Sequence, residues 1–245
     1  MRQLPDDVLR KLRNGGRLLA SPLYRRALHP RYAALPADWF MRPLRVLDAG
    51  AGPSDAALAK TLLAPGTWFE AINIVPRPAG TEGAAFDAYH VRDLDKTDLD
   101  FVEDGSFDYV VCSHTIEHLE DGVAVLNRLC AKVRPGGRLY LEWPSMESLS
   151  FPIRGLGLNF YDDPTHRATY PLALVADIVE KAGFEVVYAG KRHVWLRMIS
   201  SPFLTFYHSL KARRLRLYDL WDWTGFAYVV TALRPLSQGP GDRAG

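Results

Sequence analysis

The stretch VLDAGAGPSD, from Val46 to Asp55, decides the fold. It continues an apolar run that begins at Leu44 and predicts a buried strand, and Pro53 suits the first turn of a helix. Gly50 and Gly52 allow the backbone between the strand and the helix to turn sharply and to approach a ligand closely. The free N–H groups at the start of the helix face the same ligand. The stretch therefore predicts a strand, a glycine turn and a helix that bind a polar small molecule.

The composition is that of a globular protein. Of the 245 residues, 48% are hydrophobic and 24% are charged, which is enough for a sizeable core. No run approaches the roughly 18 apolar residues of a membrane span, and the N-terminus lacks the apolar core of an export signal. Cys112 and Cys130 show no disulfide pattern and are predicted to be buried, reduced thiols. These features predict a cytoplasmic protein.

Strands and helices alternate along the chain. Six apolar runs bounded by turn residues are predicted strands, at 44–50, 67–75, 107–114, 138–143, 184–196 and 226–235. Predicted helices cover 53–66, 121–133 and 172–183, the last with Thr169 and Pro171 as its cap and first turn. This alternation is typical of an α/β fold with a doubly wound, mostly parallel sheet and helices on both faces. The weak connection between the last two strands predicts that one late strand runs antiparallel.

The chain is predicted to have three parts. Residues 1–40, interrupted by prolines, form an N-terminal helical extension, residues 41–235 form the main domain, and residues 236–245 form a flexible C-terminal tail. Within the main domain, residues 201–224 are an insertion. Apolar and aromatic residues recur at helical spacing from 203 to 221, among basic residues. Such a segment suits peripheral contact with an anionic membrane surface, a substrate entrance, a second subunit, or packing on its own sheet.

Three segments, in this order and spacing, resemble class I S-adenosylmethionine-dependent methyltransferases. They are LDAGAG (Leu47–Gly52), EDGSFDYVVCSHTIEHLED (Glu103–Asp121) and LCAKVRPGGRLYLEWPS (Leu129–Ser145). The resemblance implies a Rossmann-like, seven-stranded sheet with S-adenosylmethionine bound across the carboxyl ends of the first strands. It therefore implies an enzyme that transfers a methyl group.

The resemblance also assigns cofactor contacts residue by residue. The implied set is Asp48, Gly50, Gly52, Asn73, Asp93, Leu94, Ser113 and His114. The negative charge of Asp48 would repel the pyrophosphate of a dinucleotide and attract a cation, such as the amino group of the cofactor. Asn73 replaces the acid that holds the ribose hydroxyls in the family, and Ser54 replaces the third glycine of the turn; an amide still hydrogen-bonds a hydroxyl. Asp108 matches a family landmark that we interpret as structural.

The stretch SHTIEHLED, from Ser113 to Asp121, gathers His114, Glu117 and His118. Three interpretations stay open. The cluster orients a loop beside the cofactor, or a histidine removes the proton of an acceptor hydroxyl, or the three residues bind a divalent metal together with His166. The last pattern resembles methyltransferases of small-RNA ends, with His114 in place of an acid. We predict His118 or His166 as the catalytic base, with His114 shaping the pocket, and do not favour a metal.

Two further resemblances bear on the acceptor. DPTH, from Asp163 to His166, resembles a loop of methyltransferases from bacterial glycan gene clusters, so the first prediction is O-methylation of a sugar hydroxyl in a glycan or glycolipid, at the inner face of the membrane where the acceptor is lipid-linked. SHTIEHLED also resembles ubiquinone-pathway enzymes, so a small aromatic or quinone-like hydroxyl is the alternative. A metal-dependent RNA-end 2′-O-methyltransferase and a non-catalytic cofactor-binding module remain open. A nucleic-acid partner is not expected, and the sequence leaves the oligomeric state undetermined.

Overall fold

The computed structural model describes residues 29–52, 55–77, 86–152, 154–213, 215 and 217–236. The predicted extension is therefore described only from residue 29. Pro53, Ser54 and the tail from residue 237 lie outside the described residues.

Seven strands form one sheet in the order β3-β2-β1-β4-β5-β7-β6. Their bounds are β1 Arg45–Ala49, β2 Trp68–Asn73, β3 Ala88–Val91, β4 Phe107–Ser113, β5 Val133–Pro144, β6 Glu185–Lys191 and β7 Ala227–Leu233. Strand β7 pairs antiparallel with both β5 and β6, and the pairs among β1 to β5 are all parallel. The prediction of a mostly parallel sheet with one antiparallel late strand is confirmed. The strand order reverses between β1 and β4, which opens a crevice at their carboxyl ends.

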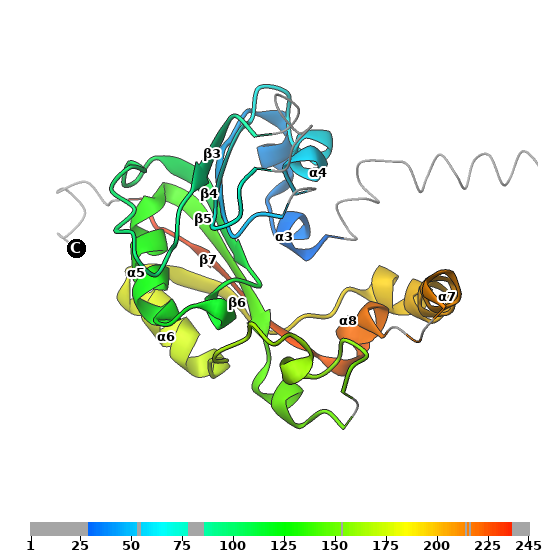
Figure 1. The fold of residues 1–245 in the computed structure, drawn as a ribbon. Helices are drawn as coiled ribbons and strands as arrows, with labels where there is room; N and C mark the ends of the chain where they lie inside the picture. The colour runs from blue at the N-terminus through cyan, green and yellow to red at the C-terminus, as the bar shows by residue number, and fades with distance from the viewer. Residues whose placement is uncertain are drawn as a thin grey trace, which may run out of the picture.

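Helices cover both faces of the sheet (Figure 1). The α-helices are α3 Pro30–Ala33, α4 Asp55–Leu62, α5 Gly122–Lys132, α6 Leu172–Lys181, α7 Trp195–Ala212 and α8 Trp221–Thr224. The 3₁₀ turns are η1 Ala37–Met41, η2 Ile116–His118, η3 Met146–Ser150, η4 Phe160–Asp162 and η5 Tyr218–Leu220. Helices α5 and α6 lie over one face and α3 and α4 over the other, whereas α7 and α8 stand apart from both (Figure 1).

Each face of the sheet has its own apolar core, because successive side chains of a strand point to opposite faces. Leu47 of β1 joins the core beneath α5 and α6, with Leu129 and Val179. Its neighbour Val46 joins the second core, with Trp39 and Phe69. Cys112 and Cys130 are both buried and free, as predicted.

The edges of the sheet differ from the prediction. Strand β3 was missed because it is a short edge strand whose side chains are only partly buried, so it lacks an apolar run. The predicted strand 184–196 ends at Lys191. There the chain leaves the sheet because the carboxylate of Asp222 accepts hydrogen bonds from the Arg192 side chain and from the N–H of Val194, just before α7 begins.

The insertion also differs from its prediction. Helix α7 begins at Trp195 and ends at Ala212, because the backbone of the next residue, Arg213, is left-handed (φ 52°), so 203–221 is not one helix. Trp221 instead stacks on Phe226, with ring centroids 4.3 Å apart. Thr169 does not cap α6, because its hydroxyl donates to the carbonyl of Pro144 at the end of β5. Within the described part of the chain, we find no helix whose length and apolar character would let it cross a bilayer.

Candidate active site

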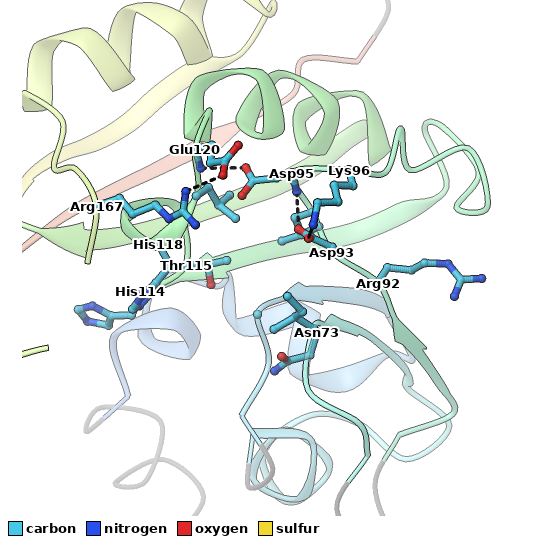
Figure 2. A pocket seen from close by; sticks show the side chains of 14 residues that line it. Asn73, Arg92, Asp93, Asp95, Lys96, His114, Thr115, His118, Glu120 and Arg167 are labelled. Atoms are coloured by element: carbon cyan, nitrogen blue, oxygen red, sulfur yellow. Dashed lines mark hydrogen bonds and ion pairs between the residues drawn. The ribbon is translucent and has the colours of Figure 1, made fainter. Parts of the chain in front are cut away.

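A pocket of about 290 Å³ opens at the carboxyl ends of β1, β2 and β4 (Figure 2). Five of the eight predicted cofactor residues line it, namely Gly50, Asn73, Asp93, Leu94 and His114. His118 and Arg167 lie at its wall as well. The other three predicted contacts, Asp48, Gly52 and Ser113, are not among the described residues that line it.

The glycine turn requires Gly50 for two reasons. Its backbone has a φ of 86°, a conformation that L side chains rarely adopt. A Cβ at this position would lie 2.0 Å from Oγ1 of Thr115. That hydroxyl donates to the carbonyl of Ala49 at 3.0 Å and so fixes the end of β1 against the loop after β4. The turn therefore holds backbone, without a side chain, at the floor of the pocket.

Asp48 is almost fully buried, and a cation of the protein itself lies beside it. Nη1 of Arg31 is 3.2 Å from its Oδ2. The hydroxyl of Tyr109 donates to the carbonyl of Arg31 and helps to hold this segment against the sheet. The guanidinium of Arg31 therefore satisfies part of the predicted attraction of Asp48 for a cation.

The amide of Asn73 is tied to the cofactor loop. Its Nδ2 donates to the carbonyl of Ala51 at 2.8 Å, and its Oδ1 accepts from the N–H of Val75 at 2.9 Å. Asn73 therefore braces the glycine turn against the end of β2. The second N–H and the second lone pair of the amide remain as capacity for a ligand hydroxyl.

Charged residues form the outer wall of the pocket (Figure 2). Nζ of Lys96 lies 3.0 Å from Oδ2 of Asp93, and this hydrogen bond lowers the pKa of Asp93 below its usual value. Oδ1 of Asp95 accepts from the N–H of Glu120 at 2.9 Å, and Arg167 pairs with Glu120 at 2.8 Å. These contacts join the loop after β3 to the loop after η2, and close the pocket on that side.

His114 is held between two carboxylates. Its Nδ1 lies 3.1 Å from Oε1 of Glu117 and its Nε2 lies 3.0 Å from Oε1 of Glu142. Burial disfavours the charged imidazole, but the hydrogen bonds to both carboxylates outweigh it and raise the pKa of His114 to about 9. At neutral pH this ring is an imidazolium without a free lone pair, so it cannot accept a proton from an acceptor.

A buried ion-pair network continues from His114 toward α7 and α8. Nη1 of Arg192 lies 2.5 Å from Oε1 of Glu142, and Nε of Arg192 lies 3.0 Å from Oδ1 of Asp222. Nε of Arg197, in α7, lies 3.2 Å from Oδ2 of Asp222. Sequence reasoning missed this network. The sequence did carry a signal for it, because Glu142, Arg192 and Asp222 are charged residues within apolar or aromatic runs, and a buried charge requires a partner.

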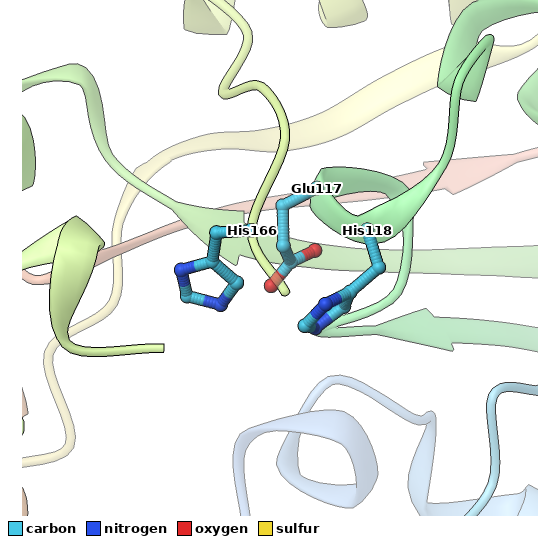
Figure 3. Close-up of side chains that lie close together, drawn as sticks. All are labelled: Glu117, His118 and His166. Carbon is cyan, nitrogen blue, oxygen red and sulfur yellow. The ribbon is translucent and has the colours of Figure 1, made fainter. Parts of the chain in front are cut away.

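The imidazoles of His118 and His166 lie close together in the structure. His118, in η2, and His166, in the loop before α6, have ring centroids 4.8 Å apart. Glu117, which is fully buried, lies with them, and one ligand atom from each of the three residues falls within 4.8 Å of the others (Figure 3). The arrangement offers nitrogen and carboxylate lone pairs that accept either a proton or a cation.

A second cavity, of about 330 Å³, adjoins the first and shares His114 and His118 with it. Tyr218, Trp221 and Phe226 form an aromatic wall. The DPTH loop and Asp162, which directly precedes it, also line this cavity, but the carboxylates of Asp162 and Asp163 already accept hydrogen bonds from neighbouring residues. The carboxylate of Asp162 accepts from the backbone N–H groups of residues 155, 157, 158 and 159, and Asp163 accepts from Thr165.

Asp108 lies away from both cavities, in agreement with its structural interpretation. Its carboxylate accepts from the N–H of Arg45 at 2.7 Å and from the side chains of Arg42 and Arg134 at 3.1 and 2.6 Å.

Known proteins resemble the chain both in sequence and in fold. A Ubiquinone biosynthesis O-methyltransferase of Xanthomonas oryzae pv. oryzae is 30% identical over 133 residues, which are 51% of this chain and 54% of that protein. The corresponding protein of Xanthomonas euvesicatoria pv. vesicatoria is 28% identical over 122 residues, 47% of this chain and 49% of that protein. The chain thus spans about half the length of the curated relatives it matches.

Solved structures share the fold. An S-adenosylmethionine dependent methyltransferase from Mesorhizobium loti has a TM-score of 0.57 at 16% identity and covers 87% of this chain and 98% of its own. A SAM dependent methyltransferase from Archaeoglobus fulgidus has a TM-score of 0.56 at 21% identity, with 87% and 94% covered. A family model described as a methyltransferase domain matches residues 19–189, which is more than half of the chain. The chain therefore belongs to the class I S-adenosylmethionine-dependent methyltransferase family.

Proposed function

We propose that this protein transfers a methyl group from S-adenosylmethionine to a hydroxyl of a small aromatic or quinone-like acceptor. One observation carries the proposal: an aromatic cavity meets the family's cofactor pocket at His114 and His118. A flat aromatic ring packs well against Trp221 and Phe226. The acids of the neighbouring loop are already hydrogen-bonded to that loop, so they are poor partners for the many hydroxyls of a sugar. The names of the half-length relatives support the same class of acceptor.

The chain supplies a suitable site for the cofactor. Gly50 brings backbone to the pocket floor, Asn73 keeps hydrogen-bonding capacity beside it, and Leu94 adds an apolar surface. The cofactor, when bound, supplies an already activated methyl group. The protein must then hold the acceptor oxygen in line and provide for the loss of its proton.

The proton of the acceptor hydroxyl passes to the cluster of Glu117, His118 and His166. His118 lines both cavities, so its ring lies where the acceptor meets the cofactor. The buried carboxylate of Glu117 lies beside the rings of His118 and His166. His114 is already charged and holds Glu117 and Glu142 in place.

A methyl-transfer assay tests the proposal. Protein is incubated with methyl-labelled cofactor and either an alkylated catechol or a methyl glycoside, and the labelled product is counted. We expect transfer to the catechol and a loss of roughly 100-fold in kcat for His118→Gln, within the range attributed to acid–base groups. Half-buried His208, which pairs with Asp219 in the insertion, provides the matched control His208→Gln, which should keep full activity. Failure to bind the demethylated cofactor in calorimetry would refute the proposal.

A glycan or glycolipid hydroxyl is the second candidate. The DPTH loop at the second cavity favours it, because it resembles loops of glycan methyltransferases, and aromatic walls also stack on sugar rings. Transfer to the glycoside but not to the catechol would select this candidate.

We propose further that helix α7 contacts a membrane surface. Apolar residues form one exposed stripe along it, comprising Trp195, Ile199, Phe203, Phe206 and Leu210. The side chain of Phe203 is 78% exposed. Lys211 and Arg213 lie at the C-terminal end of the helix, where they suit anionic headgroups. Such contact gives access to an acceptor with a lipid tail.

Vesicle co-sedimentation tests this contact. We expect binding to vesicles with anionic lipid and clearly weaker binding of the double variant Phe203→Glu, Phe206→Glu. Met41 is exposed at the end of η1, away from α7 in the sequence, and provides the matched control Met41→Glu, which should bind as the parent protein does. Equal binding of all three proteins would exclude α7 as the contact.

A further inference from the structure

We propose that Glu117, His118 and His166 bind one divalent transition-metal ion. The proposal goes beyond methyl transfer, because it concerns a cation site that exists whether or not the acceptor is identified correctly. Its basis is that the three side chains lie close together (Figure 3), with one possible ligand atom from each within 4.8 Å of the others.

The tautomer of His166 follows from its partner. Its Nδ1 lies 2.6 Å from the carbonyl oxygen of Phe160. A carbonyl only accepts, so Nδ1 must carry the hydrogen. Unless the ring is doubly protonated, Nε2 carries a free lone pair, and a backbone carbonyl on the other nitrogen is the usual support of a metal-bound histidine.

The tautomer of His118 follows from a chain of two hydrogen bonds. The hydroxyl of Thr165 lies 2.6 Å from Oδ1 of Asp163 and 2.9 Å from Nδ1 of His118. The carboxylate accepts the only hydroxyl hydrogen, so the Thr165 oxygen accepts from His118, and Nδ1 carries the hydrogen. Nε2 of His118 is therefore the free nitrogen. The hydrogen bonds through Thr165 to Asp163 also fix the orientation of the His118 ring.

Glu117 supplies the third ligand. Its side chain is fully buried, and His114 occupies only one of its oxygens, Oε1. The other oxygen, Oε2, is buried and has no hydrogen-bond partner among the described residues. A buried carboxylate oxygen without a partner is destabilising, because it has lost its hydrogen bonds to water. The carboxylate lies between the two imidazole rings, so a cation there would satisfy all three groups at once (Figure 3).

The ligand set indicates the class of ion. Two imidazoles and one carboxylate suit Fe²⁺, Co²⁺, Ni²⁺ or Zn²⁺ better than Mg²⁺ or Ca²⁺, which prefer oxygen. Three protein ligands leave coordination positions open. His118 and His166 both line the aromatic cavity, so the open positions face the space assigned to the acceptor.

The role of the ion, unlike its binding, rests on the proposed function. A hydroxyl bound to a divalent cation loses its proton more easily. With the ion in place, the imidazole lone pairs are occupied, so the hydroxyl proton passes to solvent, whereas without the ion it passes to the imidazoles as proposed above. The acceptor oxygen then forms its bond to the methyl carbon as the bond from that carbon to sulfur breaks, and the electron pair stays on the sulfur.

Metal titration tests the site directly. Protein without a histidine tag is stripped with a chelator and titrated with Co²⁺ and with Zn²⁺, followed by calorimetry and by the visible absorption of bound Co²⁺. We expect one ion per chain, with loss of measurable binding in Glu117→Gln and in His166→Gln. Thr165→Val, which removes the support of His118, should weaken binding about 10-fold to 100-fold. His208→Gln is the matched control and should bind as the parent protein does.

The outcomes separate the two proposals. Absence of binding, or equal binding in Glu117→Gln and the parent protein, would overturn the metal site. Circular dichroism and affinity for the demethylated cofactor check that each variant is folded. Stoichiometric Co²⁺ binding without any methyl transfer would leave the site standing and refute the proposed function. Methyl transfer that is undiminished in chelator would overturn the role given to the ion.

Discussion

The cofactor half and the acceptor half of the crevice are built differently. The cofactor half lies on the ends of β1, β2 and β4, and backbone turns such as the one at Gly50 shape it. The acceptor half is made of the DPTH loop, η5 and α8, and aromatic side chains shape it. The first half is therefore set by the sheet itself, whereas the second can vary without disturbing the sheet. The two halves share His114 and His118, and a buried junction behind them is formed by Arg192, which pairs with Glu142 of β5 and with Asp222 of α8.

Breaking this junction should have the largest effect. Arg192→Met leaves the buried carboxylates of Glu142 and Asp222 without their shared cation, so we expect a loss of about 4 kcal/mol in the free energy of unfolding. Urea denaturation measures it. Lys181→Met is the control, because the pair of Lys181 with Asp177 is exposed and its loss should cost well under about 1 kcal/mol. Equal effects of the two variants would contradict the importance of the junction.

Gly50→Ala should damage the cofactor half alone. The new Cβ would collide with Thr115 and force a left-handed backbone on alanine, so we expect affinity for the demethylated cofactor to fall about 100-fold, or about 3 kcal/mol. Calorimetry provides the measurement. Gly105→Ala is matched in conformation, with a φ of 61° but open space around its Cβ, and should leave that affinity unchanged. A similar loss in both variants would argue against the steric explanation.

Asp108 stabilises the fold outside both halves. Burial raises its pKa, but hydrogen bonds from the N–H of Arg45 and from Arg134 and Arg42 outweigh burial and hold the pKa below its usual value. The stabilisation is therefore complete above about pH 4, the unfolded pKa, and is lost as the pH falls through the folded pKa. Asp108→Asn should cost about 2 kcal/mol at neutral pH. Urea denaturation from pH 7 to 3 should show the gap between variant and parent narrowing; a constant gap would contradict the assignment.

Trp221→Ala should alter the acceptor half with the smallest effect. It removes the ring that stacks on Phe226 and lies 5.1 Å from His114, so we expect the KM of the acceptor to rise about 10-fold, or about 1.4 kcal/mol. Affinity for the demethylated cofactor should stay the same in calorimetry. A matching loss of cofactor affinity would show that the two halves are not independent.

The same division explains what could be predicted from the sequence. The glycine turn and the flanking strand and helix depend on local backbone geometry, so a short stretch predicts them. Strand β3 depends on pairing with β2, and its residues show no apolar pattern of their own. The ion pairs of Arg192 join residues 30 and 50 positions apart, which spacing along the chain does not reveal. His118 and His166 do lie close together in the structure, and their joint role in catalysis stays a prediction.

The burial of Cys112 has a chemical consequence. Cys112 is the last residue but one of β4, two residues before His114 and close to the proposed site of an electrophilic methyl donor, where a thiolate would be a strong nucleophile. Burial in the apolar core raises the pKa of this thiol far above neutral, and burial raises that of Cys130 to about 12. Both sulfurs therefore stay protonated and shielded. Neither thiol is therefore available as a nucleophile that would take the methyl group in place of the acceptor.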